Sequence, residues 1–114
     1  MPLENTNLTQ FQKRVLELTK KIPKGKVATY GLLARLLGNG NLSRAVGNAL
    51  NKNPFPIIIP CHRVIRSDGF VGGFAKGTEM KVKLLKEENV VINNKNVINL
   101  KRYLVNIFEL KKQE

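Results

Sequence analysis

Two short amphipathic segments separated by a glycine-containing turn constrain the fold of this chain most strongly. Thr29 precedes the first segment and Gly38 follows it, as expected for a helix cap and a helix stop. The apolar residues of this segment are Leu32, Leu33, Leu36 and Leu37. After a tight connection at 38–41, a second segment begins at Asn41 or Ser43, and its apolar residues are Ala45, Val46, Ala49 and Leu50. Two short helices joined in this way are typical of a helix-turn-helix.

Further helices are predicted on both sides of this pair. Thr9 and Gln12 have the spacing of a capping box, and apolar residues at helical spacing follow, so we expect a helix over 10–21. A turn at 22–26 separates this helix from the pair. Thr78 is suited to cap another helix that ends near 88–89, and its inward-facing residues are Met80, Leu84 and Leu85.

Shorter elements complete the prediction. Pro54 and Pro56 end the second helix of the pair, and the apolar run at 57–59 predicts a short buried strand. A glycine-rich loop covers 68–77. Residues 90–100 predict a small hairpin with an asparagine-rich turn. A last amphipathic helix is expected to carry Tyr103, Leu104, Ile107 and Phe108.

Charge and composition narrow the partners and the location. Twenty Lys and Arg residues against eight Asp and Glu give a net charge of +12 and a pI near 10.2, which favours a polyanionic partner. Nucleic acid is the first candidate and an anionic membrane surface the second, while a lysine-rich solvated surface explains the charge equally well. The sequence has no apolar run long enough to span a membrane and no secretion signal. A single cysteine fits a reducing, cytoplasmic location.

The chain places its one cysteine and its one histidine side by side, as Cys61 and His62, directly after Pro60. Buried free cysteines are common, so a core position is the first interpretation of Cys61. One cysteine and one histidine cannot complete a tetrahedral zinc site, so we expect no metal. Two interpretations remain, namely a hydrolase thiol activated by the imidazole and a thiol that accepts a transferred group.

Geometry sets conditions on the reactive interpretations. Adjacent residues of an extended chain point to opposite faces, so Cys61 and His62 share a proton only if the chain turns or a water bridges them. A nearby histidine favours the thiolate, and a carboxylate behind the histidine would orient it. By chain order the best-placed carboxylates are those of Glu87 and Glu88. The glycine-rich loop lacks the Lys-Ser/Thr pair of a P-loop, so no cofactor motif is present.

The segment "IPCHRVI" resembles the active-site signature of the O6-alkylguanine-DNA alkyltransferases, also called methylated-DNA–protein-cysteine methyltransferases. "GKVATYGLLARLLGN" resembles the first part of the helix-turn-helix of this family, and "SRAVGNALNKNPFPIIIPCHRVI" resembles its recognition helix, asparagine hinge and cysteine segment. "SDGFVGGFAKG" and "KVKLLKEE" resemble the substrate loop and the helix that carries the glutamate of the family. The resemblance covers about 11–89.

The resemblance implies a role for each matching residue. Cys61 accepts the alkyl group, His62 acts as a base through a water, Glu88 orients His62, and Asn53 holds the active-site turn. Tyr30 aids flipping of the target nucleotide, and Arg44 enters the duplex in place of the flipped base. Small residues on the recognition helix, Ala45 and Gly47 among them, allow close approach to the minor groove. The base pocket would be lined by Val64, Ile65, Gly72, Gly73, Phe74 and Ala75.

Together the residues and the resemblance predict a mainly α fold with minor β structure. We expect residues 1–114 to form a single alkyltransferase domain, small and winged-helix-like, with a helix-turn-helix and a short cysteine-bearing strand or turn. The chain begins shortly before its first helix, so the N-terminal domain of most family members is expected to be absent. Phe74 and Ala75 stand where many relatives have tyrosine and serine, so hydroxyl groups that would bind the leaving guanine are missing.

The expected activity is irreversible, single-turnover transfer of an alkyl group from O6-alkylguanine in double-stranded DNA to Cys61. No cofactor and no membrane partner are expected, O4-alkylthymine is left open as a second lesion, and the expected location is the cytoplasm, at the nucleoid. Two alternatives stay open. One is an alkyltransferase-like protein that binds the lesion without transfer. The other is a helix-turn-helix regulator in which Cys61 is only a core residue.

Overall fold

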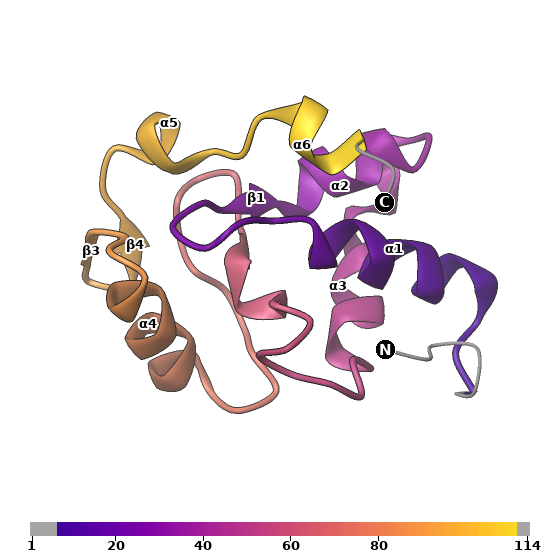
Figure 1. The fold of residues 1–114 in the computed structure, drawn as a ribbon, viewed down its shortest axis with the longest axis horizontal. Helices are drawn as coiled ribbons and strands as arrows, with labels where there is room; N and C mark the ends of the chain where they lie inside the picture. The colour runs from indigo at the N-terminus through magenta and orange to yellow at the C-terminus, as the bar shows by residue number, and fades with distance from the viewer. Residues whose placement is uncertain (1–6, 112–114) are drawn as a thin grey trace.

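A computed structural model describes residues 7–111. The helices α1 (Gln10–Lys20), α2 (Tyr30–Leu36) and α3 (Ser43–Asn51) pack together on one side of the molecule, and α6 (Ile107–Lys111) lies against α1 (Figure 1). On the other side lie α4 (Thr78–Glu87) and a hairpin of β3 (Ile92–Asn93) and β4 (Asn96–Val97). Short helical turns occur at η2 (Gly40–Leu42), η3 (Cys61–Arg63) and α5 (Leu100–Tyr103).

A two-stranded parallel sheet separates two hydrophobic cores. Strand β1 (Ala28–Thr29) pairs with β2 (Val64–Ile65), with Ala28 opposite Val64. Successive residues of a strand point to opposite faces, so Val64 packs with α1, α2 and α3 while Ile65 packs with α4 and the hairpin. Because the turn η3, which contains Cys61, directly precedes this strand, it lies at the boundary between the cores.

The predicted mainly α fold with minor β structure is confirmed, and several local predictions hold. Thr9 caps α1 in a capping box with Gln12, because the Thr9 hydroxyl accepts from the Gln12 amide at 3.1 Å and the Gln12 side chain accepts from the Thr9 amide at 3.0 Å. Thr29 caps α2 through the amide of Leu32 at 3.0 Å. The hairpin turn consists of Asn94 and Lys95, both at positive φ, as a tight two-residue turn requires.

The prediction of a buried strand at 57–59 is wrong. Ile57 and Ile58 are 46 % and 68 % exposed, and only Ile59 is buried. The chain turns here instead, because the Ile59 amide donates to the Phe55 carbonyl at 2.8 Å and Ile57 adopts a φ of 75°. This turn returns Ile59 to the core directly before the active-site residues.

Two helix predictions also need correction. The cap of α4 is Gly77 at a φ of 97°, and Thr78 is the first helical residue. The expected last helix is divided into α5 and α6, because Val27 donates to the Tyr103 carbonyl and accepts from the Val105 amide, both at 2.8 Å. This pairing holds residue 104 extended, and it leaves Phe108 72 % exposed rather than buried on an amphipathic face. Within the described residues, no helix is long and apolar enough to cross a membrane.

Replacing Thr9 by alanine tests the contribution of the capping box. The substitution removes the acceptor for the Gln12 amide, so we expect the free energy of unfolding to fall by about 1 kcal/mol. Urea denaturation followed by circular dichroism measures this change. Thr9→Ser keeps a hydroxyl acceptor and is expected to retain most of the stability. Equal midpoints for Thr9→Ala and the unchanged protein would show that the cap does not stabilise α1.

Candidate active site

The chain turns at the cysteine–histidine pair. Pro60 precedes η3, and within this turn the Arg63 amide donates to the Pro60 carbonyl at 2.9 Å, while the Cys61 amide donates to the Ile59 carbonyl at 2.7 Å. The thiol of Cys61 and the imidazole of His62 are both buried. The turn required by the sequence argument is therefore present, although the segment is a 3-10 turn that leads into β2 rather than part of a strand.

Asn53 connects the end of α3 to the thiol. Its side-chain amide nitrogen donates to Cys61 Sγ at 3.3 Å and to the Ile59 carbonyl at 2.9 Å, while its oxygen accepts from the Phe55 amide at 2.8 Å. The Asn53 side chain thus connects the end of α3 to the segment that carries the cysteine. The same contact places a hydrogen-bond donor on the sulfur.

Opposing effects act on the ionisation of Cys61. Burial raises the pKa of the thiol, and this effect is the largest. The hydrogen bond from Asn53 and the positive charge of Lys81 lower the pKa, but they do not fully offset burial. At neutral pH Cys61 is therefore a thiol, and a nucleophilic sulfur requires removal of its proton at the time of reaction.

A glutamate holds the imidazole beside this thiol. His62 Nε2 lies 3.0 Å from Glu88 Oε2, and Arg63 binds both oxygens of the same carboxylate, from Nε at 2.9 Å and from Nη2 at 2.7 Å. Arg63 Nη1 also donates to the Ile22 carbonyl at 2.7 Å. Of the two glutamates that chain order allowed, Glu88 faces the histidine and Glu87 is exposed.

The ionisation of this cluster leaves His62 a neutral base. Burial raises the pKa of Glu88, but the hydrogen bonds from Arg63 and His62 outweigh it, and the pKa lies below its usual value. Burial lowers the pKa of His62 despite its contact with Glu88. An ionised Glu88 accepts from Nε2–H, so the lone pair of neutral His62 is on Nδ1. Among the described residues, this buried Nδ1 has no hydrogen-bond partner.

Lys81 is a site residue that the sequence argument missed. Its ammonium group is fully buried and donates to the carbonyls of Val64 at 2.6 Å and Gly73 at 3.1 Å and to the hydroxyl of Tyr30 at 3.3 Å. Burial lowers the pKa of Lys81 to about 8. Lys81 takes the inward position expected for Met80, which is 37 % exposed. Its spacing of four residues before the buried Leu85 was the signal available in the sequence.

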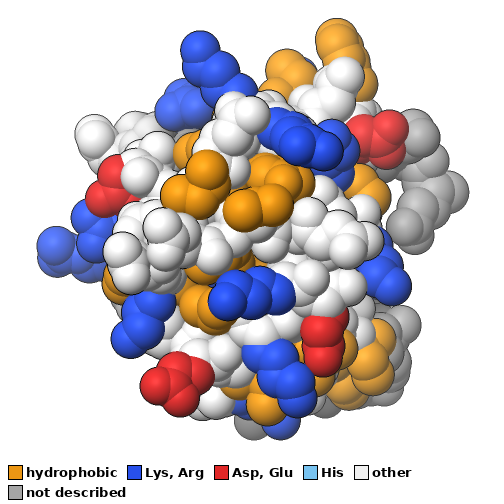
Figure 2. Space-filling model, turned by 90° about the vertical axis from the view of Figure 1, so that its left-hand side faces the viewer, with side chains coloured by type: hydrophobic (Ala, Val, Ile, Leu, Met, Phe, Trp, Pro, Cys, Tyr) orange, Lys and Arg blue, Asp and Glu red, His pale blue; other side chains and the backbone are white. Residues whose placement is uncertain are grey.

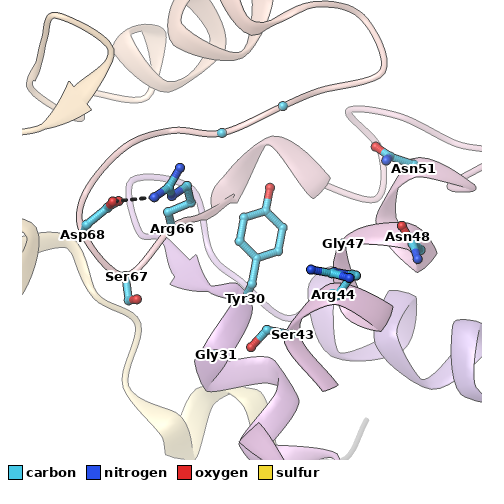
Figure 3. Close-up of a pocket in the computed structure, with 12 residues that line it drawn as sticks. Tyr30, Gly31, Ser43, Arg44, Gly47, Asn48, Asn51, Arg66, Ser67 and Asp68 are labelled. Carbon is cyan, nitrogen blue, oxygen red and sulfur yellow. Dashed lines mark hydrogen bonds and ion pairs between the residues drawn. The ribbon is translucent and has the colours of Figure 1, made fainter. Parts of the chain in front are cut away.

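An open groove of about 720 Å³ lies between α2, α3 and the loop after β2. Figure 3 shows Tyr30 in the middle of this groove, with Arg44 of α3 on one side and Arg66 and Asp68 of the loop after β2 on the other. The remaining lining residues are Gly31, Ser43, Gly47, Asn48, Asn51, Ser67, Gly72 and Gly73. Apart from Asp68, the charged side chains in this lining are basic, and most other members are small or polar.

A small hollow beside this groove is lined by Cys61. It has a volume of about 10 Å³ and shares Tyr30, Gly47, Asn51 and Gly73 with the lining of the groove. Its other lining residues are Leu50, Cys61, Phe74 and Ala75. The hollow at the sulfur therefore adjoins the groove, with the shared residues between them.

The structure places the expected base-pocket residues unevenly. Phe74 and Ala75 line the hollow, and the Phe74 ring meets His62 edge-on with the centroids 6.4 Å apart. Val64 and Ile65 are fully buried in β2 and belong to the lining of neither the groove nor the hollow. Ala45, half-buried on α3, is also outside both linings.

Basic side chains are not confined to the groove. Figure 2 views the molecule from the side of α4 and the hairpin, and Lys and Arg side chains occupy several separate places on this face. The net charge therefore does not locate a site, and the groove is identified by its shape and by the thiol beside it. Within 7–111, no group of three or more His, Cys, Asp and Glu side chains is arranged to hold a metal ion.

Comparison with known proteins identifies the family. The sequence model of the 6-O-methylguanine DNA methyltransferase, DNA binding domain, matches residues 10–90. The chain belongs to this family. It is 46 % identical over 82 residues to the methylated-DNA–protein-cysteine methyltransferase of Methanothermobacter thermautotrophicus, covering 72 % of this chain and 46 % of that protein. The protein of the same name from Methanosarcina acetivorans is 51 % identical over 80 residues, which cover 70 % of this chain and 51 % of that protein. The chain thus spans about half the length of these relatives.

Two solved structures show the same fold. The Mycobacterium tuberculosis OGT in complex with DNA matches with a TM-score of 0.70 and 41 % identity, over 73 % of this chain and 51 % of that chain. The S. pombe Atl1, in complex with damaged DNA containing O6-carboxymethylguanine, matches with a TM-score of 0.76 and 31 % identity. This second match covers 89 % of this chain and 99 % of the other.

Replacing Lys81 by methionine tests its buried charge. Between pH 8 and 10.5 the unfolded chain retains the lysine proton while the folded chain releases it, so the free energy of unfolding of the parent protein rises with pH in this window. Relative to Lys81→Met, the rise is expected to be about 3 kcal/mol at 1.36 kcal/mol per pKa unit. Urea titrations across this range measure it.

The comparison is made in a Cys61→Ser background, which removes the titrating thiol that interacts with Lys81. Lys83→Met, an exposed change on the same helix, is the matched control. Parallel stability profiles for Lys81→Met and its parent would show that the ammonium group is not destabilised by burial.

Proposed function

We propose that this protein repairs duplex DNA by transferring the alkyl group of O6-alkylguanine irreversibly to its own Cys61. The observation that carries the proposal is the buried thiol of Cys61, which lines a hollow beside the groove and precedes in sequence a neutral histidine held by Glu88. A regulator that only reads DNA does not need a nucleophile and a base in this arrangement.

The proposed reaction uses the groups around the sulfur. His62 Nδ1 takes the thiol proton through a water, and the resulting thiolate attacks the alkyl carbon. The sulfur–carbon bond forms as the carbon–O6 bond breaks, and the electron pair passes to O6 of guanine. The proton then returns from His62 to the leaving guanine, while Asn53 holds the sulfur in place. Because the product is a thioether and no second thiol is supplied, each molecule reacts once.

DNA binding and base flipping are proposed for the groove. The target atom is unreachable inside the stack, so the nucleotide must leave the duplex. Arg44, exposed near the start of α3, would take the place of the flipped base, and Tyr30 would crowd its phosphate. Ala45 and Gly47 keep the recognition helix slender enough for the minor groove. The extruded base would lie between the glycine-rich loop at 72–75 and Cys61, with Val64 and Ile65 buried behind this site.

The hollow must enlarge before a purine reaches Cys61. Its volume of about 10 Å³ corresponds to roughly one water molecule, and a guanine does not fit. The wall formed by 73–75 lies between Gly72 and Gly77, which have φ values of 79° and 97°. We infer that this short loop moves outward when the lesion enters, with the two glycines as its pivots.

Lesion binding without transfer is the second candidate function. S. pombe Atl1, whose structure holds damaged DNA containing O6-carboxymethylguanine, matches this chain with a TM-score of 0.76. Phe74 and Ala75 also supply no side-chain hydroxyl to the hollow. The presence of a thiol at position 61 favours transfer over this alternative.

Mass spectrometry of the protein after incubation with a duplex carrying one O6-methylguanine tests the proposal. We expect a mass increase of one methyl group on the peptide that contains Cys61, at no more than one per molecule. The Cys61→Ser variant is expected to bind the duplex and to remain unmodified, because the hydroxyl is a far weaker nucleophile.

A matched duplex with O4-methylthymine determines whether the second lesion is also a substrate. An unmodified protein that still retards the O6-methylguanine duplex would establish the lesion-binding function instead. Equal affinity for damaged and undamaged duplexes, with no modification, would contradict both and favour a regulator.

A further inference from the structure

Arg66 lines the groove on the side of Tyr30 opposite Arg44. It directly follows β2, and its Cγ lies 3.8 Å from the position that a Cβ on Gly72 would occupy, while the Tyr30 hydroxyl lies 3.2 Å from that same position. Figure 3 shows Arg66 and Arg44 on either side of Tyr30. A nucleotide that passes Tyr30 toward Cys61 would therefore pass Arg66.

A short turn holds the guanidinium group at this place. The Arg66 amide donates to the Phe70 carbonyl at 2.9 Å, and the Gly69 amide donates to the Arg66 carbonyl at 3.0 Å. The guanidinium carbon lies 5.5 Å from the centroid of the Phe70 ring, which supports one face of the planar group. The side chain nevertheless remains 57 % exposed, so its nitrogen donors are accessible from the groove.

Asp68 occupies part of the hydrogen-bonding edge of this arginine. Arg66 Nη2 donates to Asp68 Oδ2 at 2.8 Å, and the other carboxylate oxygen accepts from the Phe70 amide at 3.1 Å. Both side chains are more than half exposed, and such ion pairs contribute little to stability. A phosphate group presents the same type of acceptor to a guanidinium group and can replace the carboxylate.

We propose that Arg66 binds a backbone phosphate beside the extruded nucleotide and that Asp68 is its counter-ion in the free protein. The proposal rests on duplex DNA as the partner in the proposed function and assigns a role to a residue pair outside the catalytic cluster. Arg66 acts as a positioning residue, because a phosphate contact fixes the strand relative to Tyr30 and carries no base information. Asp68 limits non-specific attraction to the groove until a phosphate displaces it.

Salt-dependent binding to a short undamaged duplex, followed by fluorescence anisotropy, tests this role. Each phosphate contact contributes about 0.9 to the slope of log affinity against log salt concentration. Arg66→Gln is expected to decrease the slope by about 1 and to weaken binding about fivefold to tenfold near 0.1 M salt. Arg66→Lys keeps the charge and is expected to keep most of the slope.

Arg102→Gln is the matched control. Arg102 is an exposed arginine whose guanidinium carbon lies 5.6 Å from the Tyr103 ring centroid, but it is outside the groove. Its loss changes the net charge equally and is expected to leave the slope nearly unchanged. Asp68→Asn is expected to tighten binding severalfold in the parent protein and much less in an Arg66→Gln background, because the arginine that Asp68 neutralises is then missing.

The outcomes separate the two proposals. If the parent protein binds duplex and Arg66→Gln behaves like Arg102→Gln, the phosphate role of Arg66 is overturned while the proposed function stands. If Asp68→Asn tightens binding equally in both backgrounds, its pairing with Arg66 is irrelevant to DNA and the counter-ion role is overturned. A parent protein that binds no duplex at all removes the proposed function and this inference with it.

Discussion

The carboxylate of Glu88 joins the two halves of the molecule. It lies at the end of α4 and accepts hydrogen bonds from three nitrogen atoms of the turn at 61–63, one from His62 and two from Arg63. Through the Ile22 carbonyl, Arg63 extends the contact to the end of α1. The cluster is largely buried, and a buried pair is tolerated when its geometry is bidentate and its remaining donors are satisfied. Loss of one partner would leave a charge uncompensated between the two cores.

The same cluster determines how the thiol is kept before reaction. Burial lowers the pKa of His62 despite its contact with Glu88, so His62 stays neutral and does not drive Cys61 to the thiolate in the resting protein. Burial raises the pKa of Cys61 further, so the sulfur is protected from oxidants that attack exposed thiolates. For a protein proposed to react only once, this protection preserves the thiol until a lesion arrives and the proton is transferred.

Local signals in the sequence predicted the elements that depend on near neighbours. The Thr9 and Thr29 caps, the helix-turn-helix and the hairpin are governed by contacts within a few residues, and these predictions are confirmed. Distant backbone partners caused the errors. Ile57 is exposed because the chain turns between Pro56 and Pro60. The last helix is interrupted because Val27 pairs with the chain around residue 104.

The site was predictable in part for the same reason. Cys61 and His62 are adjacent, and Glu88 was one of two carboxylates that chain order suggested. Arg63 and Lys81 escaped notice because their partners are not their near neighbours in sequence. Arg63 binds the Glu88 carboxylate and the Ile22 carbonyl, and Lys81 binds the carbonyls of Val64 and Gly73. A basic residue in a helix is usually assigned to solvent. In the sequence, the spacing of Lys81 from Leu85 and Glu88 is the signal that Lys81 faces the core.

Two glycines leave room for the Tyr30 side chain beside the hollow at the sulfur. Tyr30 stands between Gly47 of α3 and Gly72 of the loop, where an added Cβ would lie 3.9 Å and 3.2 Å from the tyrosine ring and hydroxyl. Gly72 also has a φ of 79°, a backbone conformation that residues with a side chain rarely adopt, so both space and conformation require glycine there. The buried Lys81 ammonium group donates a hydrogen bond to the Tyr30 hydroxyl, which holds the ring on one side of the hollow. The loop at 73–75 forms another part of the wall of the hollow, and the same ammonium group donates to its Gly73 carbonyl at 3.1 Å.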